Sequence, residues 1–154
     1  MQNIEGVEVK KLNLFKDNRG SVMEILRSDD AIFEKFGQVY ITTCKPGIAK
    51  AWHYHIGQSE SFTCVKGVLK LVLYDGRKNS KTYGSIQEFR ISLENPILVK
   101  IPAFVLHGFE CGTNEELIAI SIKTEPYNPK NPDKVKVAFN DPSIPYKWES
   151  KEGG

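Results

Sequence analysis

Short runs of alternating apolar and polar residues dominate this chain, and turn residues separate one run from the next. The runs are rich in Val, Ile, Thr, Phe and Tyr, which is typical of β-strands whose two faces meet different surroundings. Many short strands at even spacing in 154 residues predict an all-β protein, either a sandwich or a closed barrel. The predicted strands are Val7–Phe15, Ser21–Leu26, Gln38–Thr43, Ala51–His55, Ser61–Val65, Val68–Tyr74, Gln87–Leu93, Leu98–Ile101, His107–Cys111 and Glu116–Lys123.

Other residues predict the turns between these strands, one helix and an irregular C-terminal tail. Lys66-Gly67 predicts a hairpin turn, and Asp75-Gly76 marks another break between strands. Only Asp29–Phe36 has a helical pattern, with Ser28 or Asp29 as its N-cap. Five prolines after residue 125 predict an irregular tail, about 125–154, wrapped on the barrel. The length fits one domain over residues 1–154.

Composition argues against a nucleic-acid-binding, membrane-spanning or secreted protein. The net charge of +2 is small and the basic residues are scattered, so no nucleic-acid partner is expected. Lys10-Lys11 and Lys134-Val135-Lys136 are interpreted as solvated faces. No apolar run approaches the roughly 20 residues that span a bilayer, and residues 1–15 do not resemble a secretory signal. The three cysteines show no CxxC spacing, which indicates buried, reduced thiols in a cytoplasmic protein.

The chain has only three histidines, and their positions suggest a common site. His53 and His55 are two apart on a predicted strand, so alternation places both imidazoles on one face. Glu60 opens the next strand after a short turn, and His107 begins a later one. Three imidazoles and one carboxylate are a suitable ligand set for one divalent metal such as Mn, Fe, Ni or Zn.

The spacing of these residues resembles the first sequence motif of the cupin superfamily. The motif runs from Gly47 through His53, His55 and Glu60 to Gly67. A looser second motif contains Pro102 and His107, with Phe104 in place of its second glycine and Cys111 in place of its closing asparagine. The resemblance implies a cupin-type double-stranded β-helix, a jelly-roll barrel, with the named side chains pointing into its interior.

Segments outside this motif resemble one cupin family, the dTDP-4-dehydrorhamnose 3,5-epimerases and related nucleotide-sugar epimerases. The similarity covers about residues 9–148. It implies an enzyme that epimerises carbons flanking the C4 ketone of a nucleotide-diphosphate 6-deoxysugar, with no cofactor. It also implies a homodimer joined through N-terminal strands. The matching segments are Asp17–Gly20 with Glu24, Gln38, Lys50–His53, Asp75–Arg77 with Ser80, Tyr83-Gly84, Leu93–Asn95, Ile101-Pro102, His107–Phe109, Thr124–Pro129 and Asn140–Pro142 with Trp148.

The same resemblance implies a role for individual residues. By position, His53 is the base next to the ketone, Asp141 orients it, and Tyr127 returns a proton on the opposite face. A His–carboxylate pair suits this chemistry, because the base needs a fixed tautomer and a pKa near neutrality. The implied substrate-binding residues are Arg19 and Lys50 at the diphosphate, Glu24 and Gln38 near the nucleotide or sugar, and His107.

Two departures from the family pattern leave alternatives open. Glu60 stands where the family carries a lysine that stabilises the enolate oxygen, and His55 replaces a usual glutamine. Lys70, Lys100 and Lys123 are candidates for the missing cation. A second hypothesis is a metal-dependent cupin enzyme with His53, His55, Glu60 and His107 as ligands, in which His53 is not a base. A third is a non-catalytic cupin that binds a sugar or nucleotide.

Overall fold

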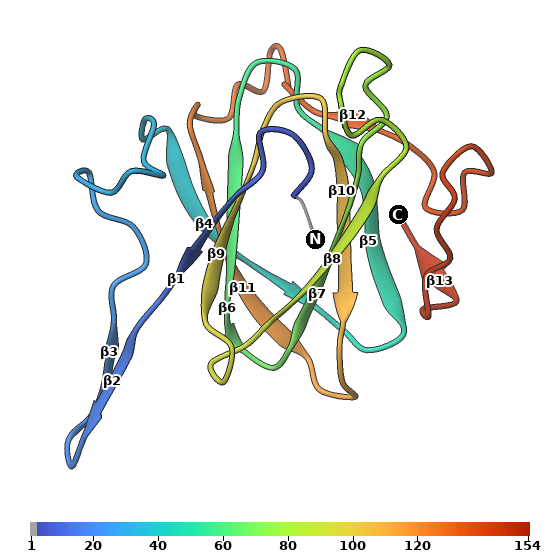
Figure 1. Ribbon diagram of the computed structural model, residues 1–154. Helices are drawn as coiled ribbons and strands as arrows, with labels where there is room; N and C mark the ends of the chain where they lie inside the picture. The colour runs from blue at the N-terminus through green and yellow to red at the C-terminus, as the bar shows by residue number, and fades with distance from the viewer. Residues whose placement is uncertain (1–2) are drawn as a thin grey trace.

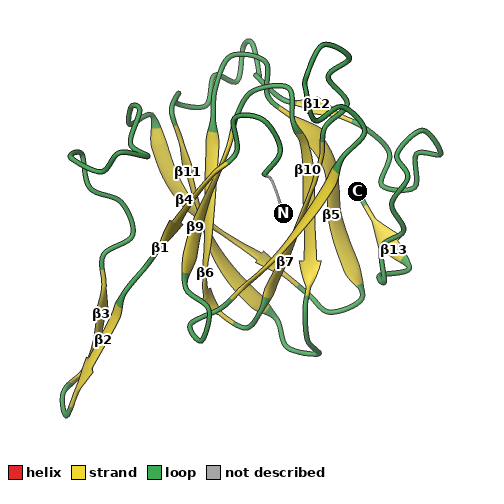
Figure 2. Ribbon diagram, viewed as in Figure 1, coloured by secondary structure: helices red, strands yellow, loops and turns green. Residues whose placement is uncertain are grey.

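The computed structural model describes residues 3–154, and these residues form strands and loops without a helix (Figure 2). The all-β, cupin-type barrel expected from the sequence is confirmed. No helix in the described residues is long and apolar enough to cross a membrane. The strands are β1 (Glu8–Lys11), β2 (Leu14–Asp17), β3 (Gly20–Met23), β4 (Gln38–Cys44), β5 (Ile48–Tyr54), β6 (Glu60–Lys66), β7 (Leu69–Tyr74), β8 (Ile86–Ile91), β9 (Ile97–Ile101), β10 (Leu106–Cys111), β11 (Leu117–Lys123), β12 (Val135–Lys136) and β13 (Glu152–Gly153).

Two sheets face each other to make the barrel (Figure 1). One sheet has the order β1-β9-β6-β11-β4, and the other has the order β12-β5-β10-β7-β8, with β13 pairing β5. All pairs within these sheets are antiparallel except β13 with β5. Strands β2 and β3 form a separate hairpin, which projects away from the barrel in Figure 1.

Alternation along the strands places the core between the sheets. In β11, Leu117, Ala119 and Ser121 are buried, whereas the residues between them are only partly covered. Most of β7 is buried, which matches its largely apolar sequence, and its one charged residue, Lys70, pairs with Glu110 and Glu149. The main core contains Phe62, Leu71 and other apolar side chains from both sheets. A polar group on the inward face, such as Ser121, is therefore unusual and points toward the site.

Two glycines allow backbone geometry that other residues would disturb. Gly67 has a φ of +70° at the predicted hairpin turn between β6 and β7, where a left-handed conformation favours glycine. Gly108, on β10, lies so close to β5 that an added Cβ would be 2.3 Å from Cβ of Ala51. The close approach of β10 to β5 brings His107 opposite His53.

Residues 125–154 form turns and loops with two short strands, β12 and β13. This segment packs on the outer face of the second sheet, where Trp52 contacts Tyr146 and Trp148 at centroid distances of 5.8 and 4.8 Å. The buried carboxylate of Glu110 accepts hydrogen bonds from the backbone N–H groups of Glu149 and Ser150. These contacts hold residues 146–150 against the second sheet.

The helix predicted over Asp29–Phe36 is wrong, because this segment forms turns. The carboxylate of Asp30 accepts the backbone N–H of Arg27 and pairs with Lys10, and this competes with helical backbone hydrogen bonds. A segment this short also lacks the length to form a helix without extensive packing. The single strand predicted over Val7–Phe15 is divided in two, since Leu12 leaves the sheet to enter a separate apolar cluster.

Candidate functional site

Four side chains from three strands and one following loop converge inside the barrel. His53 lies on β5, His55 just after it, Glu60 at the start of β6 and His107 on β10. Oε2 of Glu60 is 2.8 Å from Nε2 of His55, 3.1 Å from Nε2 of His107 and 3.4 Å from Nε2 of His53. All four residues are buried, and one ligand atom of each lies within 4.8 Å of the others. The convergence predicted from the spacing is present in the structure.

The other carboxylate oxygen of Glu60 is also surrounded by polar groups. Oε1 accepts hydrogen bonds from Ser121 Oγ at 2.6 Å and from the Tyr40 hydroxyl at 3.1 Å. Nζ of Lys123 is 3.7 Å away. Burial opposes ionisation, but the surrounding imidazoles outweigh it and hold the pKa of Glu60 well below its usual range. Glu60 is therefore a buried anion.

The outer nitrogens of two histidines fix their tautomers. Nδ1 of His107 lies 2.9 Å from the carbonyl oxygen of Val105, and Nδ1 of His55 contacts the carbonyl oxygen of Asp133. A carbonyl only accepts, so both Nδ1 atoms donate, and both neutral rings present an Nε2 lone pair to Glu60. Lone pairs facing a carboxylate oxygen repel it, so this arrangement requires a positive charge, either an added proton or a metal ion. Imidazoles held in this way by carbonyl groups are typical of metal ligands, and the donor set fits a first-row divalent metal.

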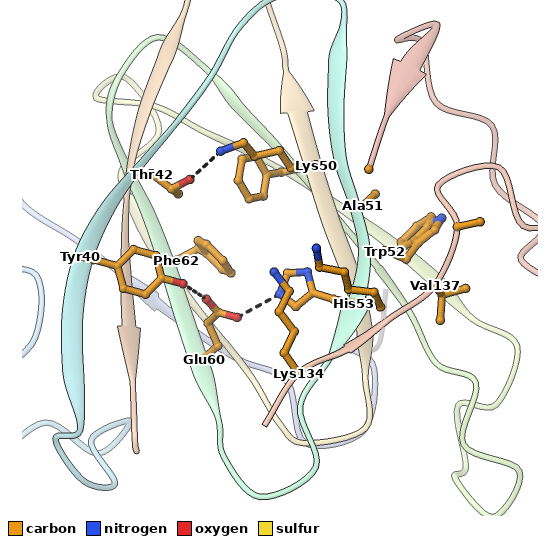
Figure 3. Close-up of a pocket in the computed structure, with 14 residues that line it drawn as sticks. Tyr40, Thr42, Lys50, Ala51, Trp52, His53, Glu60, Phe62, Lys134 and Val137 are labelled. Atoms are coloured by element: carbon orange, nitrogen blue, oxygen red, sulfur yellow. Dashed lines mark hydrogen bonds and ion pairs between the residues drawn. The ribbon is translucent and has the colours of Figure 1, made fainter. Parts of the chain in front are cut away.

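His53 differs from the other two histidines. Its Nε2 faces Glu60, and no hydrogen bond to its Nδ1 is found among residues 3–154. It lines a cavity of about 550 Å³, and Figure 3 shows its ring beside Glu60 and Lys134. Burial, followed by the nearby His107, lowers the pKa of His53 to about 3. The ring is therefore neutral near pH 7 and retains one nitrogen lone pair, although this pKa lies well below the near-neutral value expected of the base.

The cavity beside His53 combines positive charge with aromatic walls. Its lysines are Lys50, Lys134 and Lys136, and Nζ of Lys50 donates to Thr42 Oγ1 at 3.3 Å. A second cavity of about 470 Å³ lies next to it, and Tyr40 and Lys134 line both. Three cations on one wall suit an anionic ligand such as a diphosphate.

The structure separates some of the residues that the family resemblance placed together. Tyr127 and Gln38 line the second cavity, where Oε1 of Gln38 accepts the backbone N–H of Tyr127 at 2.9 Å. Asp141 accepts hydrogen bonds from the backbone and side chain of Ser143, outside both cavities. The expected pairing of Asp141 with His53 is wrong, because the carboxylate that faces His53 belongs to Glu60.

Arg19 and Glu24 are also remote from the histidines of their own chain. Arg19 is on the projecting hairpin and pairs with Asp17 at 2.6 Å, whereas Glu24 follows the hairpin and pairs with Arg27 at 3.3 Å (Figure 1). Both residues are exposed. Within one chain they do not contribute to either cavity.

Sequence reasoning missed several residues of the site. Tyr40 follows Gln38 by two residues on β4, so strand parity alone could have identified it. Ser121 is a polar residue on the buried face of an otherwise apolar strand, which is also a readable signal. The interpretation of Lys134-Val135-Lys136 as only a solvated face is wrong, since both lysines line the cavity.

Of the three lysines proposed to replace the missing cation, only Lys123 reaches Glu60. Lys70 pairs with Glu110 and Glu149, and Lys100 pairs with Glu8 and Glu34.

A buried histidine–carboxylate group beside a lysine-lined cavity in a cupin barrel defines a class of small-molecule enzymes with acid–base or metal chemistry. The family model described as dTDP-4-dehydrorhamnose 3,5-epimerase matches residues 1–153. The chain belongs to this family of sugar epimerases.

Relatives and solved structures agree with the family. The chain is 36% identical over 148 residues to the spore coat polysaccharide biosynthesis protein SpsL of Bacillus subtilis, with 96% of this chain and 98% of that protein covered. It is 35% identical over 156 residues to a probable low-salt glycan biosynthesis epimerase of Haloferax volcanii, with 100% of both chains covered. The crystal structure of a dTDP sugar isomerase from Desulfovibrio desulfuricans superimposes with a TM-score of 0.88 at 27% identity, covering 94% of this chain and 92% of that one.

Proposed function

We propose that this protein epimerises or isomerises a dTDP-4-keto-6-deoxyhexose at a carbon next to the ketone, in the biosynthesis of a surface polysaccharide. The observation that carries the proposal is His53, a neutral imidazole at a lysine-lined cavity with the ionised Glu60 behind it. Family membership and the sugar epimerases among its relatives support the substrate class.

The geometry suits removal of a proton next to a ketone. With Nε2–H of His53 donating to Glu60, the lone pair of Nδ1 remains available to accept the proton. Glu60 then stabilises the imidazolium that forms, the role that the resemblance assigned to Asp141. Tyr127 is our proposed donor on the opposite face of the sugar, and it reaches a substrate that spans both cavities. A positioned acid or base of this kind is typically worth about 10² to 10⁴ in rate.

Substrate binding follows from the charges around the cavity. We assign the diphosphate to Lys50 and Lys136 on the cationic wall, and the adjoining cavity with Gln38 to part of the nucleotide or sugar. Arg19 and Glu24 lie too far along the hairpin to join their own site, so we propose that the hairpin completes the site of a second subunit in a homodimer. The exposed apolar residues on the hairpin and on β4 support this assembly.

Solvent deuterium exchange tests the proposed function directly. Incubation with dTDP-4-keto-6-deoxyglucose in D₂O should introduce deuterium next to the ketone, and His53→Ala should reduce the exchange to background. A matched control is Asp141→Asn, which removes a charge outside both cavities. If dTDP raises the melting temperature but the unsubstituted protein shows no exchange above the His53→Ala background, the protein is a non-catalytic binding cupin instead.

A metal-dependent enzyme is the second candidate, and the tautomers of His55 and His107 favour it. His53, His55, Glu60 and His107 would hold one divalent metal, which when bound would polarise a substrate carbonyl as a Lewis acid. His53 would then serve as a ligand, and its lone pair would not accept a proton.

Elemental analysis separates the two candidates. Protein purified without chelators or added metal should contain near one Mn, Fe, Ni or Zn per chain if the second candidate is correct. In that case Glu60→Gln should lower the metal content together with activity. Unsubstituted protein that is active at a metal content far below one per chain leaves His53 as the base.

A further inference from the structure

Glu60 creates an electrostatic problem for the proposed reaction. Removal of a proton next to a ketone moves an electron pair onto the carbonyl oxygen, which becomes negative. Glu60 is buried at the same cavity and stands where the resembling family carries the lysine that stabilises this oxygen. A carboxyl group cannot supply the positive charge that the developing oxyanion needs, so the reaction needs a cation that is not already paired with Glu60.

The lysines near the site differ in the ion pairs and hydrogen bonds that their ammonium groups already make. Nζ of Lys123 lies 3.7 Å from Glu60 and 5.3 Å from the centroid of the Tyr40 ring. Its positive charge is therefore already paired with Glu60. Lys50 donates to Thr42. For Lys134 and Lys136, no hydrogen bond or ion pair of the ammonium group is found within residues 3–154, but only Lys134 lines both cavities. Figure 3 shows the Lys134 side chain extending into the cavity beside His53 and facing Glu60.

The backbone around Lys134 is held in place from several directions. The carbonyl of Asp133 accepts from His55, and its carboxylate accepts the backbone N–H groups of Ile56 and Gly57 at 2.9 to 3.1 Å. Strand β12 then pairs with β5, with Lys136 opposite His53. Lys134 is therefore presented at the boundary of the two cavities by the same loop that fixes the His55 tautomer. The backbone that carries Lys134 is therefore held in place, which favours a reproducible position for a donor to an oxyanion.

We infer that Lys134 is the catalytic residue that stabilises the enolate oxygen, with its ammonium group donating a hydrogen bond to the former ketone oxygen. This inference rests on the proposed function. His53 takes the proton from carbon, and the electron pair of the C–H bond passes to the carbonyl oxygen. When the carbon is reprotonated, the pair returns and the ketone reforms. Lys134 keeps its own proton throughout, and no oxidant or reductant takes part.

Substitution of Lys134 tests the inference against a matched control. Lys134→Met should reduce kcat for deuterium exchange by about 10² to 10³, the range for loss of one oxyanion donor. Its affinity for dTDP should stay within about threefold, because that ligand lacks the ketone. Lys134→Arg should recover part of kcat through its retained charge. Lys130→Met removes an exposed lysine from the same tail and should leave both values unchanged.

Each alternative result has a distinct meaning. Equal kcat in Lys134→Met and the unsubstituted protein overturns the inference, and so does a loss of dTDP affinity with kcat unchanged at saturation. Absence of exchange in the unsubstituted protein refutes the proposed function itself, and the catalytic assignment of Lys134 is refuted with it. Circular dichroism and melting temperature of each variant establish that it is folded, and a variant that has lost its fold is replaced by Lys134→Gln.

Discussion

Glu60 connects the three histidines to the rest of the site, so it is the residue whose charge matters most. Its two oxygens contact His53, His55 and His107 on one side and the Ser121 and Tyr40 hydroxyls on the other. We expect Glu60→Gln to lower deuterium exchange by about 10² or more, because the neutral amide no longer stabilises an imidazolium. Asp141→Asn should keep exchange within about threefold. If Asp141→Asn lost exchange and Glu60→Gln kept it, Asp141 and not Glu60 would be the partner of His53.

Asp75 shows how a single buried charge sets acid stability. Its side chain is fully buried and accepts from Arg77 at 2.8 Å, Ser80 at 2.6 Å and Thr82 at 2.7 Å. Burial opposes ionisation, but these donors outweigh it and hold the pKa of Asp75 far below its usual range. A depressed folded-state pKa contributes stability above the unfolded value of about 3.9, and this contribution is lost as pH falls through the folded-state value.

Asp75→Asn should therefore reduce the free energy of unfolding near pH 7 by about 3 kcal/mol, the usual effect of breaking a buried charged pair. The difference between the variant and the parent should shrink as pH falls below about 4. Urea unfolding at pH 7 and at pH 3 measures both values. A difference that is the same at the two pH values would contradict the assignment of the effect to the Asp75 charge.

At the scale of elements, the loop before β10 contains a backbone conformation that its sequence does not favour. Phe104 has a φ of 65°, where the resembling motif carries glycine. Its N–H donates to the carbonyl of His55 at 2.7 Å, which holds the loop against the histidine cluster. A left-handed conformation costs a non-glycine residue roughly 1 to 2 kcal/mol.

Comparison of two substitutions at Phe104 isolates the free-energy cost of its left-handed backbone conformation. Both Phe104→Gly and Phe104→Ala remove the ring that packs against Tyr54 at a centroid distance of 6.3 Å. Phe104→Gly should be the more stable of the two by about 1 kcal/mol, because only glycine adopts the left-handed conformation without strain. Thermal or urea unfolding of the two variants measures the difference. Equal stability would mean that the loop relaxes to another conformation.

The strands were predictable because alternation depends on local sequence, and a buried face leaves a clear pattern in β11. Alternation also predicted that His53 and His55 share one face, whereas the spacing of the cupin motif predicted that Glu60 and His107 join them. The absence of a helix near Asp30 was not predictable, since side-chain hydrogen bonds to Arg27 and Lys10 decide it. The position of Asp141 and the approach of Lys134 depend on how the irregular tail packs, which no periodicity encodes.

At the scale of the whole molecule, the chain leaves apolar surface exposed on the projecting hairpin and on the outer face of β4. Phe15 and Val22 on the hairpin are 61% and 62% exposed, and Val39 and Ile41 on β4 are 54% and 66% exposed. Strand β4 is an edge of its sheet, with unpaired backbone groups along one side. Exposed apolar residues beside a free edge are typical of an interface rather than of a solvated surface.

A homodimer in which the hairpin of one subunit covers β4 of the other would bury these residues and deliver Arg19 to the second site. We therefore expect a dimer in light scattering or sedimentation at micromolar concentration, and a monomer for Ile41→Asp, because a charge in an apolar interface is poorly solvated. Deuterium exchange by Ile41→Asp should fall with dimerisation, although His53 and Glu60 are intact. Tyr83→Glu, at an exposed position in the loop between β7 and β8, is the control and should remain dimeric and active. An active Ile41→Asp monomer would show that each site is complete within one chain, and Arg19 would then have no part in binding the substrate.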